Sequence, residues 1–323
     1  MNDVIRAAAL ASLALLTALP TDTGAQEFPG RTIRVVVPFA PGGGTDVFAR
    51  LLSVRLTEAF GQTVVVDNRA GAGGNIGTEI VVKSPPDGYT LLFVTASVAI
   101  NPSLYSKLTF DVRKDLIAIT QPGSTSSVLT VHPSVPARSP QEVVALSKRT
   151  KGGLNFGSNG SGTSSHLAGV MFMQLAGVQL THIPYKGAAP AMTALLGGET
   201  DLGFPGVNSV IPMLRTGKLR ALAVSTKKRS SVLPDIPTLD SLYPGIDIDN
   251  WFVLFAPLKT PAAIITRVHS EVIKALGGTD IKAFMAREGI DPVGSSPAEA
   301  AEFVRREVDK FAKVVKAAGI KAE

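Results

Sequence analysis

The sequence contains no cysteine and few aromatic residues or histidines. The absence of cysteine excludes disulfide bonds, thiolate metal sites and a lipid-modified cysteine anchor. The four histidines are spread widely and show no metal-ligand spacing, so we expect no bound metal. One tryptophan and four tyrosines are available for stacking, and the lysines and arginines are scattered along the chain. This composition argues against nucleic acid as a partner.

Long apolar runs are also missing, apart from one near the start. Residues 1–25 contain one arginine, an apolar stretch over residues 7–19 and the small-residue ending Thr23-Gly24-Ala25. The apolar stretch is shorter than the roughly 20 residues that a membrane-spanning helix needs. This layout is typical of a secretory signal peptide. We expect cleavage after Ala25 and an exported, soluble mature protein.

The chain is nonetheless rich in apolar residues, at 45% hydrophobic and 18% charged, which suffices for one large core or two smaller ones. Short β-branched runs alternate with helical stretches, which indicates an α/β fold with mostly parallel sheets flanked by helices. The predicted strands are residues 33–37, 64–66, 91–94, 129–132, 154–157, 181–183, 202–204 and 219–224. The main predicted helices are residues 46–60, 140–150, 164–176, 190–196, 261–276 and 297–317.

Two polar passages that contain proline and serine, residues 119–127 and 225–239, flank a self-contained series of strands and helices. We interpret both passages as crossovers between two lobes. This interpretation predicts a discontinuous first lobe, residues 26–123 and 229–323, and a second lobe, residues 124–228. A cleft would lie between the lobes.

A glycine-rich loop follows the first predicted strand, in the stretch VPFAPGGGTD (37–46). No lysine follows Gly44, which excludes a phosphate-binding P-loop. A second glycine-rich stretch, DNRAGAGGNIG (67–77), has Ile76 where a dinucleotide fingerprint needs glycine, so we expect no cofactor. Two interpretations of the first loop stay open together. Its backbone N–H groups could bind an anion at a helix N-terminus, or the glycines could simply turn the chain, with Thr45 as N-cap.

The stretch NFGSNGSGTSSHLAG (155–169) repeats this arrangement in the predicted second lobe, with a strand, a glycine-rich loop and a helix. It offers neutral hydrogen-bond donors at Ser158, Asn159, Ser161, Thr163 and Ser164. Two helix N-termini, one on each lobe, could face each other across the cleft. Together they could hold the anionic groups of a ligand.

The same stretch raises the alternative of an exported serine hydrolase. The residues around Ser161 do not have the G-x-S-x-G spacing of a nucleophile elbow. A site assembled through space, with Ser161 or Ser164 as nucleophile and His166 as base, stays open as the second hypothesis.

Six blocks of sequence, in order, resemble the periplasmic solute-binding proteins of tripartite tricarboxylate transporters, often called the Bug family. The blocks cover nearly all of the chain after residue 25, and they are PGRTIRVVVPFAPGGGTDVFARLLSVRL, GQTVVVDNRAGAGGNIGTEIVVKSPPDGYTLLF, FGSNGSGTSSHLAGVMF, HIPYKGAAPAMTALLGGETDLGF, GKLRALAVSTKKRSSVLPDIPTL and NWFVLFAPLKTP. One departure is Ser126, near which similar proteins often have proline.

The resemblance implies a type II periplasmic-binding-protein (Venus flytrap) fold, whose two α/β lobes close on a ligand. It also implies a periplasmic, non-enzymatic protein that delivers its ligand to integral-membrane transporter subunits. The implied ligand is a small carboxylate: a di- or tricarboxylate, an acidic amino acid or an aromatic carboxylate. We expect the protein to be a monomer.

Because ligands of open α/β sheets bind beyond the carboxyl ends of strands, this rule selects among the cleft positions that the resemblance implies. Phe204 is expected to form an apolar wall, whereas Asp201 and Trp251 are expected to be structural. The expected ligand-binding residues are Phe39, Pro41, Gly42, Gly43, Gly44, Thr45, Thr95, Ser97, Ser158, Asn159, Ser161, Gly162, Thr163, Ser164, Tyr185, Gly187, Ala188 and Phe204.

Overall fold

The computed structural model describes residues 28–319, so the expected signal peptide lies outside the described residues. All the helices and strands described below belong to one compact unit that begins at Arg31. Within the described part of the chain, no helix combines the length and the apolar character needed to span a membrane.

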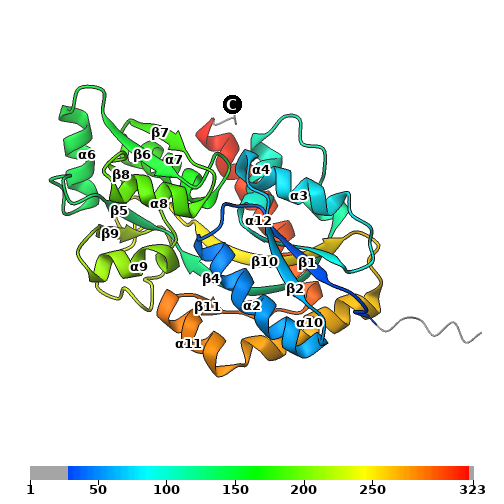
Figure 1. Ribbon diagram of the computed structural model, residues 1–323. Helices are drawn as coiled ribbons and strands as arrows, with labels where there is room; N and C mark the ends of the chain where they lie inside the picture. Colours follow the sequence, from blue (N-terminus) through cyan, green and yellow to red (C-terminus); the bar gives the residue numbers. More distant parts are fainter. Residues whose placement is uncertain (1–27, 320–323) are drawn as a thin grey trace, which may run out of the picture. The chain divides into compact units, whose positions relative to one another are not determined.

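The first sheet has six strands in the order β11-β4-β10-β3-β1-β2 (Figure 1). β1 is parallel to β2 and β3, whereas β10 is antiparallel to β3 and β4. The short β11 is antiparallel to β4 at the edge of the sheet. The strands are β1 (Ile33–Val37), β2 (Val64–Asn68), β3 (Thr90–Thr95), β4 (Leu116–Ser126), β10 (Asp249–Pro257) and β11 (Asp291–Pro292).

The core beside this sheet is aromatic. Phe48 on α2 makes edge contacts with Phe93 and Phe252, at centroid distances of 5.6 and 5.3 Å, and those two rings stack on each other. Because β10 is a nearly continuous apolar run, it is buried in the middle of the sheet. We call each sheet together with its helices one half of the protein. The helices of the first half are α2 (Gly44–Phe60), η1 (Ala72–Gly74), α3 (Asn75–Val82), α4 (Ser97–Leu104), α5 (Val112–Asp115), α10 (Ala262–Leu276), α11 (Thr279–Glu288) and α12 (Pro297–Ala318).

The second sheet has five strands in the order β7-β6-β8-β5-β9. β6 is parallel to β7 and β8, whereas β5 is antiparallel to β8 and β9. The strands are β5 (Val128–Val131), β6 (Leu154–Ser158), β7 (Leu180–Pro184), β8 (Leu202–Gly203) and β9 (Arg220–Val224). The helices beside them are α6 (Pro140–Arg149), α7 (Ser164–Ala176), α8 (Ala188–Leu196) and α9 (Val207–Arg215).

The α/β class with two sheets flanked by helices is confirmed, but the sheets are mixed rather than mostly parallel. Four of the nine strand pairings in the described residues are parallel and five are antiparallel. Two of the antiparallel pairings come from β10, which was not predicted as a strand, and two come from β5 in the second sheet.

Residues 119–127, which we expected to form a crossover, lie almost entirely in strand β4. Polar side chains are tolerated there because their hydroxyls are paired. Thr120 Oγ1 donates to the Ser295 carbonyl at 2.7 Å, and Thr125 Oγ1 donates to the Gly289 carbonyl at 2.9 Å. The chain passes from the first sheet to the second at Ser127, and it returns between β9 and β10.

Candidate ligand-binding pocket

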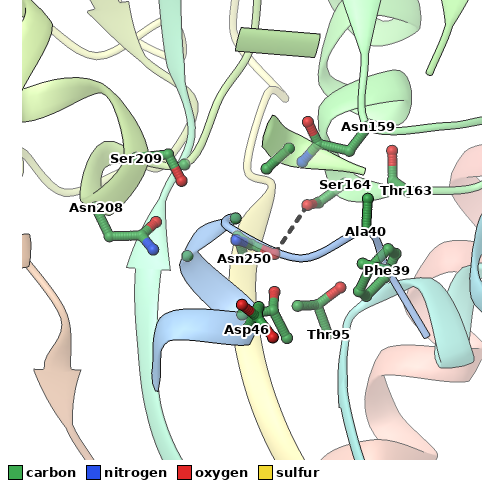
Figure 2. A pocket seen from close by; sticks show the side chains of 15 residues that line it. Phe39, Ala40, Asp46, Thr95, Asn159, Thr163, Ser164, Asn208, Ser209 and Asn250 are labelled. Atoms are coloured by element: carbon green, nitrogen blue, oxygen red, sulfur yellow. Dashed lines mark hydrogen bonds between the residues drawn. The ribbon is translucent and has the colours of Figure 1, made fainter. Parts of the chain in front are cut away.

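A small pocket is lined by residues at or just beyond the ends of β1 and β3 of the first sheet and of β6 and β8 of the second (Figure 2). Its volume is about 20 Å³, which is room for about one water molecule. The residues that line it are Phe39, Ala40, Gly43, Gly44, Thr45, Asp46, Thr95, Asn159, Thr163, Ser164, Ala188, Gly206, Asn208, Ser209 and Asn250.

Four helices begin at this pocket: α2, α7, α8 and α9. Their N-caps are Gly43, Thr163, Gly187 and Gly206, and none of the three glycines can supply a capping side chain. The first-turn N–H groups of α2, α8 and α9 therefore have no capping side chain, whereas in α7 Thr163 Oγ1 accepts the His166 N–H. No lysine, arginine or histidine is among the residues that line the pocket. An anion at this position would interact with backbone N–H groups and helix dipoles.

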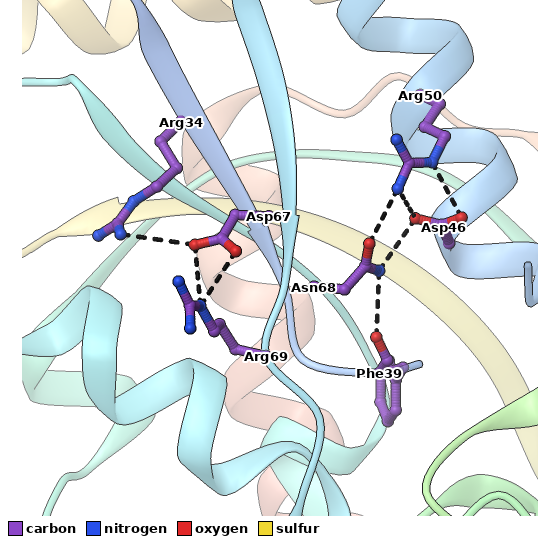
Figure 3. A network of polar contacts seen from close by, with 7 residues as sticks. All are labelled: Arg34, Phe39, Asp46, Arg50, Asp67, Asn68 and Arg69. Atoms are coloured by element: carbon purple, nitrogen blue, oxygen red, sulfur yellow. Dashed lines mark hydrogen bonds and ion pairs between the residues drawn. The ribbon is translucent and has the colours of Figure 1, made fainter. Parts of the chain in front are cut away.

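The first loop, residues 39–45, is anchored by a charged network (Figure 3). Asp46 Oδ2 accepts hydrogen bonds from the Gly42 N–H at 2.9 Å and from Arg50 Nε at 3.0 Å. Asn68 Nδ2 donates to Asp46 Oδ1 at 2.9 Å and to the Phe39 carbonyl at 3.1 Å. Burial raises the pKa of Asp46, but the hydrogen bonds from Arg50, Gly42 and Asn68 outweigh it and hold the pKa below its usual value. The carboxylate is therefore charged, and its charge is offset by Arg50.

The second loop, residues 158–163, is anchored by hydroxyls. The Asn159 N–H donates to Ser165 Oγ at 3.0 Å, and Thr163 Oγ1 donates to the Gly160 carbonyl at 2.7 Å. The two hydroxyls, Thr163 Oγ1 and Ser165 Oγ, lie 2.9 Å apart. Every anchor named here is neutral at all ordinary pH values.

Two stacked imidazoles complete the support of the second loop. Their ring centres are 4.2 Å apart. His182 Nε2 lies 2.6 Å from Ser158 Oγ, and His166 Nδ1 accepts the Gly162 N–H at 3.2 Å. Burial lowers the pKa of His166 to about 4, and burial together with the charge of His166 lowers the pKa of His182 to about 3. Both rings are therefore neutral near pH 7.

Direct contacts connect the two halves around the pocket. Ser164 Oγ donates to Asn250 Oδ1 at 3.1 Å (Figure 2). The Ala40 N–H donates to the Lys186 carbonyl at 3.1 Å, and Tyr105 Oη donates to the Ser161 carbonyl at 3.3 Å. The cavity inside these contacts holds about one water, which is less space than a ligand of several heavy atoms occupies.

One buried polar atom at the pocket lacks a partner. The side chain of Asn208 is 4% exposed, and its Oδ1 makes no hydrogen bond. An unpaired buried amide oxygen costs about 1–3 kcal/mol, which a trapped water or another hydrogen-bond donor would recover. A Cβ on Gly206 would lie 2.5 Å from Asn208 Oδ1, whereas a Cβ on Gly44 would overlap Nδ2, so the oxygen faces Gly206 and the amide NH2 faces the first loop.

Half of the expected ligand-binding residues line the pocket together. They come from both halves of the chain, and they are Phe39, Gly43, Gly44, Thr45, Thr95, Asn159, Thr163, Ser164 and Ala188. The structure thus brings the two glycine-containing loops to one place, as the sequence predicted.

The other expected residues do not line this pocket. Phe204 is fully buried in the core of the second half, with its ring 6.3 Å from Phe156 and 6.0 Å from Phe172. Strand β8 ends at Gly203, and the next side chain turns inward. The remaining residues outside the pocket lining are Pro41, Gly42, Ser97, Ser158, Ser161, Gly162, Tyr185 and Gly187.

Several of these residues support the loops instead. Ser158 contacts His182, and the Gly42 and Gly162 N–H groups are paired with Asp46 and His166. Gly187 has φ +134°, and a Cβ there would lie 2.9 Å from the Ala40 nitrogen. It therefore permits the turn before α8 to approach the first loop closely without facing the pocket.

Six lining residues were not predicted: Ala40, Asp46, Gly206, Asn208, Ser209 and Asn250. The sequence identified Asp46 as a residue of the first turn of α2. Its hydrogen bonds to Gly42, Arg50 and Asn68, which position it at the pocket, are visible only in the structure. Asn208 and Ser209 begin α9, and Asn250 lies on β10; the sequence predicted neither element.

The serine hydrolase hypothesis is wrong in its geometry. Ser164 Oγ donates to Asn250, and the contact of Ser161 is made by its carbonyl. His166 Nδ1 accepts a backbone N–H rather than a serine proton. Neither serine is therefore paired with the expected base.

A family model described as the tripartite tricarboxylate transporter family receptor matches residues 48–320. The chain is 35% identical to Protein BugT of Bordetella pertussis over 323 residues, which is 99% of both chains. Two solved structures from Rhodopseudomonas palustris are similar. One is Rpa4515 with adipate (34% identity, TM-score 0.87), covering 91% of this chain and 99% of that one. The other is MatC with bound malate (30% identity, TM-score 0.83), covering 89% and 100%.

Proposed function

The chain belongs to the tripartite tricarboxylate transporter receptor family, a family of periplasmic solute-binding proteins and not of enzymes, and from this premise we propose that its pocket binds a small carboxylate. The protein then delivers the carboxylate to integral-membrane transporter subunits. The adipate and malate bound to two relatives support a carboxylate as the ligand class.

The observation that carries this proposal is the meeting of four helix starts at one pocket without a cationic side chain. Hydrogen bonds from such groups to a carboxylate contribute roughly 1.5–3 kcal/mol each. Four or five of them would supply the roughly 8 kcal/mol of a micromolar ligand, with a surplus for the cost of closing on it.

Binding requires opening, and we place the hinge where the chain changes sheets. There the Ser225 N–H donates to the Ser127 carbonyl at 2.8 Å, and Ser225 Oγ donates to the Ile248 carbonyl at 2.6 Å. In this proposal residues 26–123 with 229–323 and residues 124–228 are lobes that rotate about these segments. The working protein is an exported periplasmic monomer, cleaved after Ala25, without metal or cofactor.

Thermal unfolding of residues 26–323 tests the proposal, because a ligand that binds only the folded state raises its stability. The panel is malate, adipate, citrate, glutamate, benzoate and hexanoate. We expect a saturable rise in the unfolding temperature with at least one of them. No rise across the panel, in protein unfolded and refolded to remove carried-over ligand, would overturn the carboxylate assignment.

A matched pair of variants at Ser209 sharpens this test. Ser209 lies in the first turn of α9 and lines the pocket. The carboxylate of Ser209→Asp interacts favourably with the dipole of α9, so the fold should be retained. It also places a negative charge beside the ligand, so the ligand-induced rise in unfolding temperature should vanish. Ser209→Asn has the same size without the charge and should keep most of the rise. Equal responses of the two variants would contradict the location of the site.

A further inference from the structure

A larger cavity adjoins the pocket on its α9 and α11 side, and we call it the outer chamber. Its volume is about 370 Å³, and it shares Gly43, Gly44, Ala188, Asn208 and Ser209 with the pocket as a common wall. These shared residues form the wall between the two spaces. A Cβ on Gly43 would lie 3.1 Å from the Ala188 Cβ, and a Cβ on Gly44 would overlap the Asn208 side-chain amide, so the two sides of this wall are in contact in this structure.

The outer chamber is mainly apolar. Val47 on α2, Met192 on α8, Met213 on α9 and Phe284 on α11 contribute its large apolar side chains. Val47 is 41% exposed, which is high for a valine in a helix beside a binding site. Methionine side chains adapt to differently shaped apolar groups and make favourable contacts with aromatic rings.

The chamber offers no free cation for a second carboxylate. Arg287 is the one basic residue among the residues that line it, and its Nε donates to Glu288 Oε1 at 2.9 Å. Its guanidinium carbon lies 5.5 Å from the centre of the Phe284 ring. The positive charge is therefore already paired, and a second carboxylate in the chamber would lose hydration without gaining a counter-ion.

We propose that the outer chamber binds the apolar tail of a monocarboxylate, aliphatic or aromatic, whose head group occupies the inner pocket. This inference rests on the proposed function, since it assumes that the carboxylate binds at the four helix starts. The tail reaches the outer chamber between the first loop and α8 when the two halves move apart, because Gly43 and Ala188 are in contact in this structure. The preferred ligand is then amphipathic rather than a compact tricarboxylate.

Calorimetric titration with ligands of one head group tests the inference. The probes are propionate, hexanoate, 3-phenylpropionate and adipate, which is hexanoate with a second terminal carboxylate. Each buried methylene strengthens binding by roughly three- to fourfold, so hexanoate and 3-phenylpropionate should bind at least about tenfold more tightly than propionate. Adipate should bind more weakly than hexanoate.

The variants Met192→Gln and Met213→Gln keep the side-chain length but make the chamber polar. Each should remove most of the gain from the tail and leave propionate affinity unchanged. Val54→Gln, on an exposed face of α2 outside the chamber, is the control and should change nothing.

The outcomes separate the two proposals. If carboxylates bind but the tail brings no gain, or if adipate binds more tightly than hexanoate, the inference about the outer chamber is overturned while the proposed function stands. If none of the four probes and no member of the thermal panel binds, the proposed function fails and the inference fails with it.

Discussion

The two loops that meet at the pocket present the same backbone groups, but they are held in place by different chemistry. The first loop is held by Asp46, which accepts the Gly42 N–H and pairs with the charged Arg50 side chain. The second is held by hydroxyls and by two imidazoles that burial keeps neutral. Each loop ends where a helix begins, so each delivers N–H groups to the same small space.

The comparison shows that two networks of different charge can hold equivalent helix starts at one pocket without a lysine, arginine or histidine among its lining residues. Asp46 carries a charge of the same sign as the expected ligand, and it is acceptable because Arg50, Asn68 and the Gly42 N–H occupy its oxygens. The second loop achieves the same geometry without any charge. The Asp46–Arg50 network of the first loop and the hydroxyls and imidazoles of the second should therefore be weakened by different substitutions and at different pH values.

The largest effect is expected where the two halves approach most closely. A Cβ on Gly44 would overlap the Asn208 side-chain amide of α9. Gly44→Val should hold the halves apart and weaken carboxylate binding at least about 100-fold, which corresponds to roughly 2.8 kcal/mol. Because the clash lies between the halves, the ligand-free unfolding temperature should change little. Titration calorimetry and thermal unfolding measure both.

The control for this variant is Gly197→Val, at the far end of α8, where φ is −80° and a Cβ would come no closer than 3.4 Å to its neighbour, the Thr193 carbonyl oxygen. It should bind like the wild type. Equal loss of binding in the two variants would mean that Gly44→Val acts through general damage rather than through the pocket.

Removing the charged anchor of the first loop should have the next largest effect. Asp46→Asn deprives Arg50 of its partner and places an amide against Asn68, so we expect about 1–3 kcal/mol loss in unfolding free energy and roughly tenfold weaker binding. Urea denaturation and calorimetry are the measurements. Asp67→Asn alters a nearby carboxylate that pairs with Arg34 and Arg69 outside the pocket (Figure 3) and should leave binding intact.

A smaller effect is expected from the neutral anchor of the second loop. Ser165 Oγ accepts the Asn159 N–H and is buried. Ser165→Ala should cost about 1 kcal/mol of stability and weaken binding only several-fold, because Thr163 still holds the Gly160 carbonyl. If Ser165→Ala weakened binding more than Asp46→Asn, the ranking of the two anchors would be wrong.

Acid should weaken the second loop before the first. The folded pKa values of His166 and His182, about 4 and about 3, lie below the unfolded value near 6.5, so the unfolded state binds protons first. Their contribution to stability is complete above pH 6.5 and is lost as pH falls toward 4 and then 3. The pKa of Asp46 is also lowered, so its contribution is lost only below about pH 4.

Urea denaturation between pH 7.5 and 4.5 checks this order. His182→Gln keeps a polar group beside Ser158 but cannot titrate, so its stability should fall less steeply with acid than that of the wild type. Binding at pH 7.5 should change little. An unchanged pH dependence in this variant would show that the histidine pair does not control acid stability.

The sequence predicted the elements with local signals and missed those that depend on distant partners. β1 was predicted with its observed bounds, and α7 likewise, because each has a clear apolar pattern beside a glycine-rich turn. Residue Trp251 was expected to be packed, and it is fully buried with Nε1 donating to Glu307 Oε2 at 2.9 Å. Asp201 was expected to be structural, and it exchanges two hydrogen bonds with Asn155.

The missed parts of the site share one cause. β10 inserts between β3 and β4, and its partners lie more than 120 residues away in the sequence (Asp249 pairs with Ser126, and Phe255 with Leu92), so no local pattern predicts the position of Asn250. Helix α9 begins at a glycine without a capping side chain and contains Pro212, so no local sequence pattern predicted the start of the helix or the position of Asn208. Phe204 was placed by the rule for strand ends, but β8 has two residues, and the short strand lets the next side chain enter the core.

The most direct test of the central claim is a crystal structure of residues 26–323 with the carboxylate that gives the largest thermal shift. We predict that the carboxylate oxygens lie within hydrogen-bond distance of backbone N–H groups at residues 43–45 and 164–165, with no lysine or arginine side chain in contact. A carboxylate paired with a basic side chain, or bound outside the pocket, would contradict the claim that helix starts alone bind the anion.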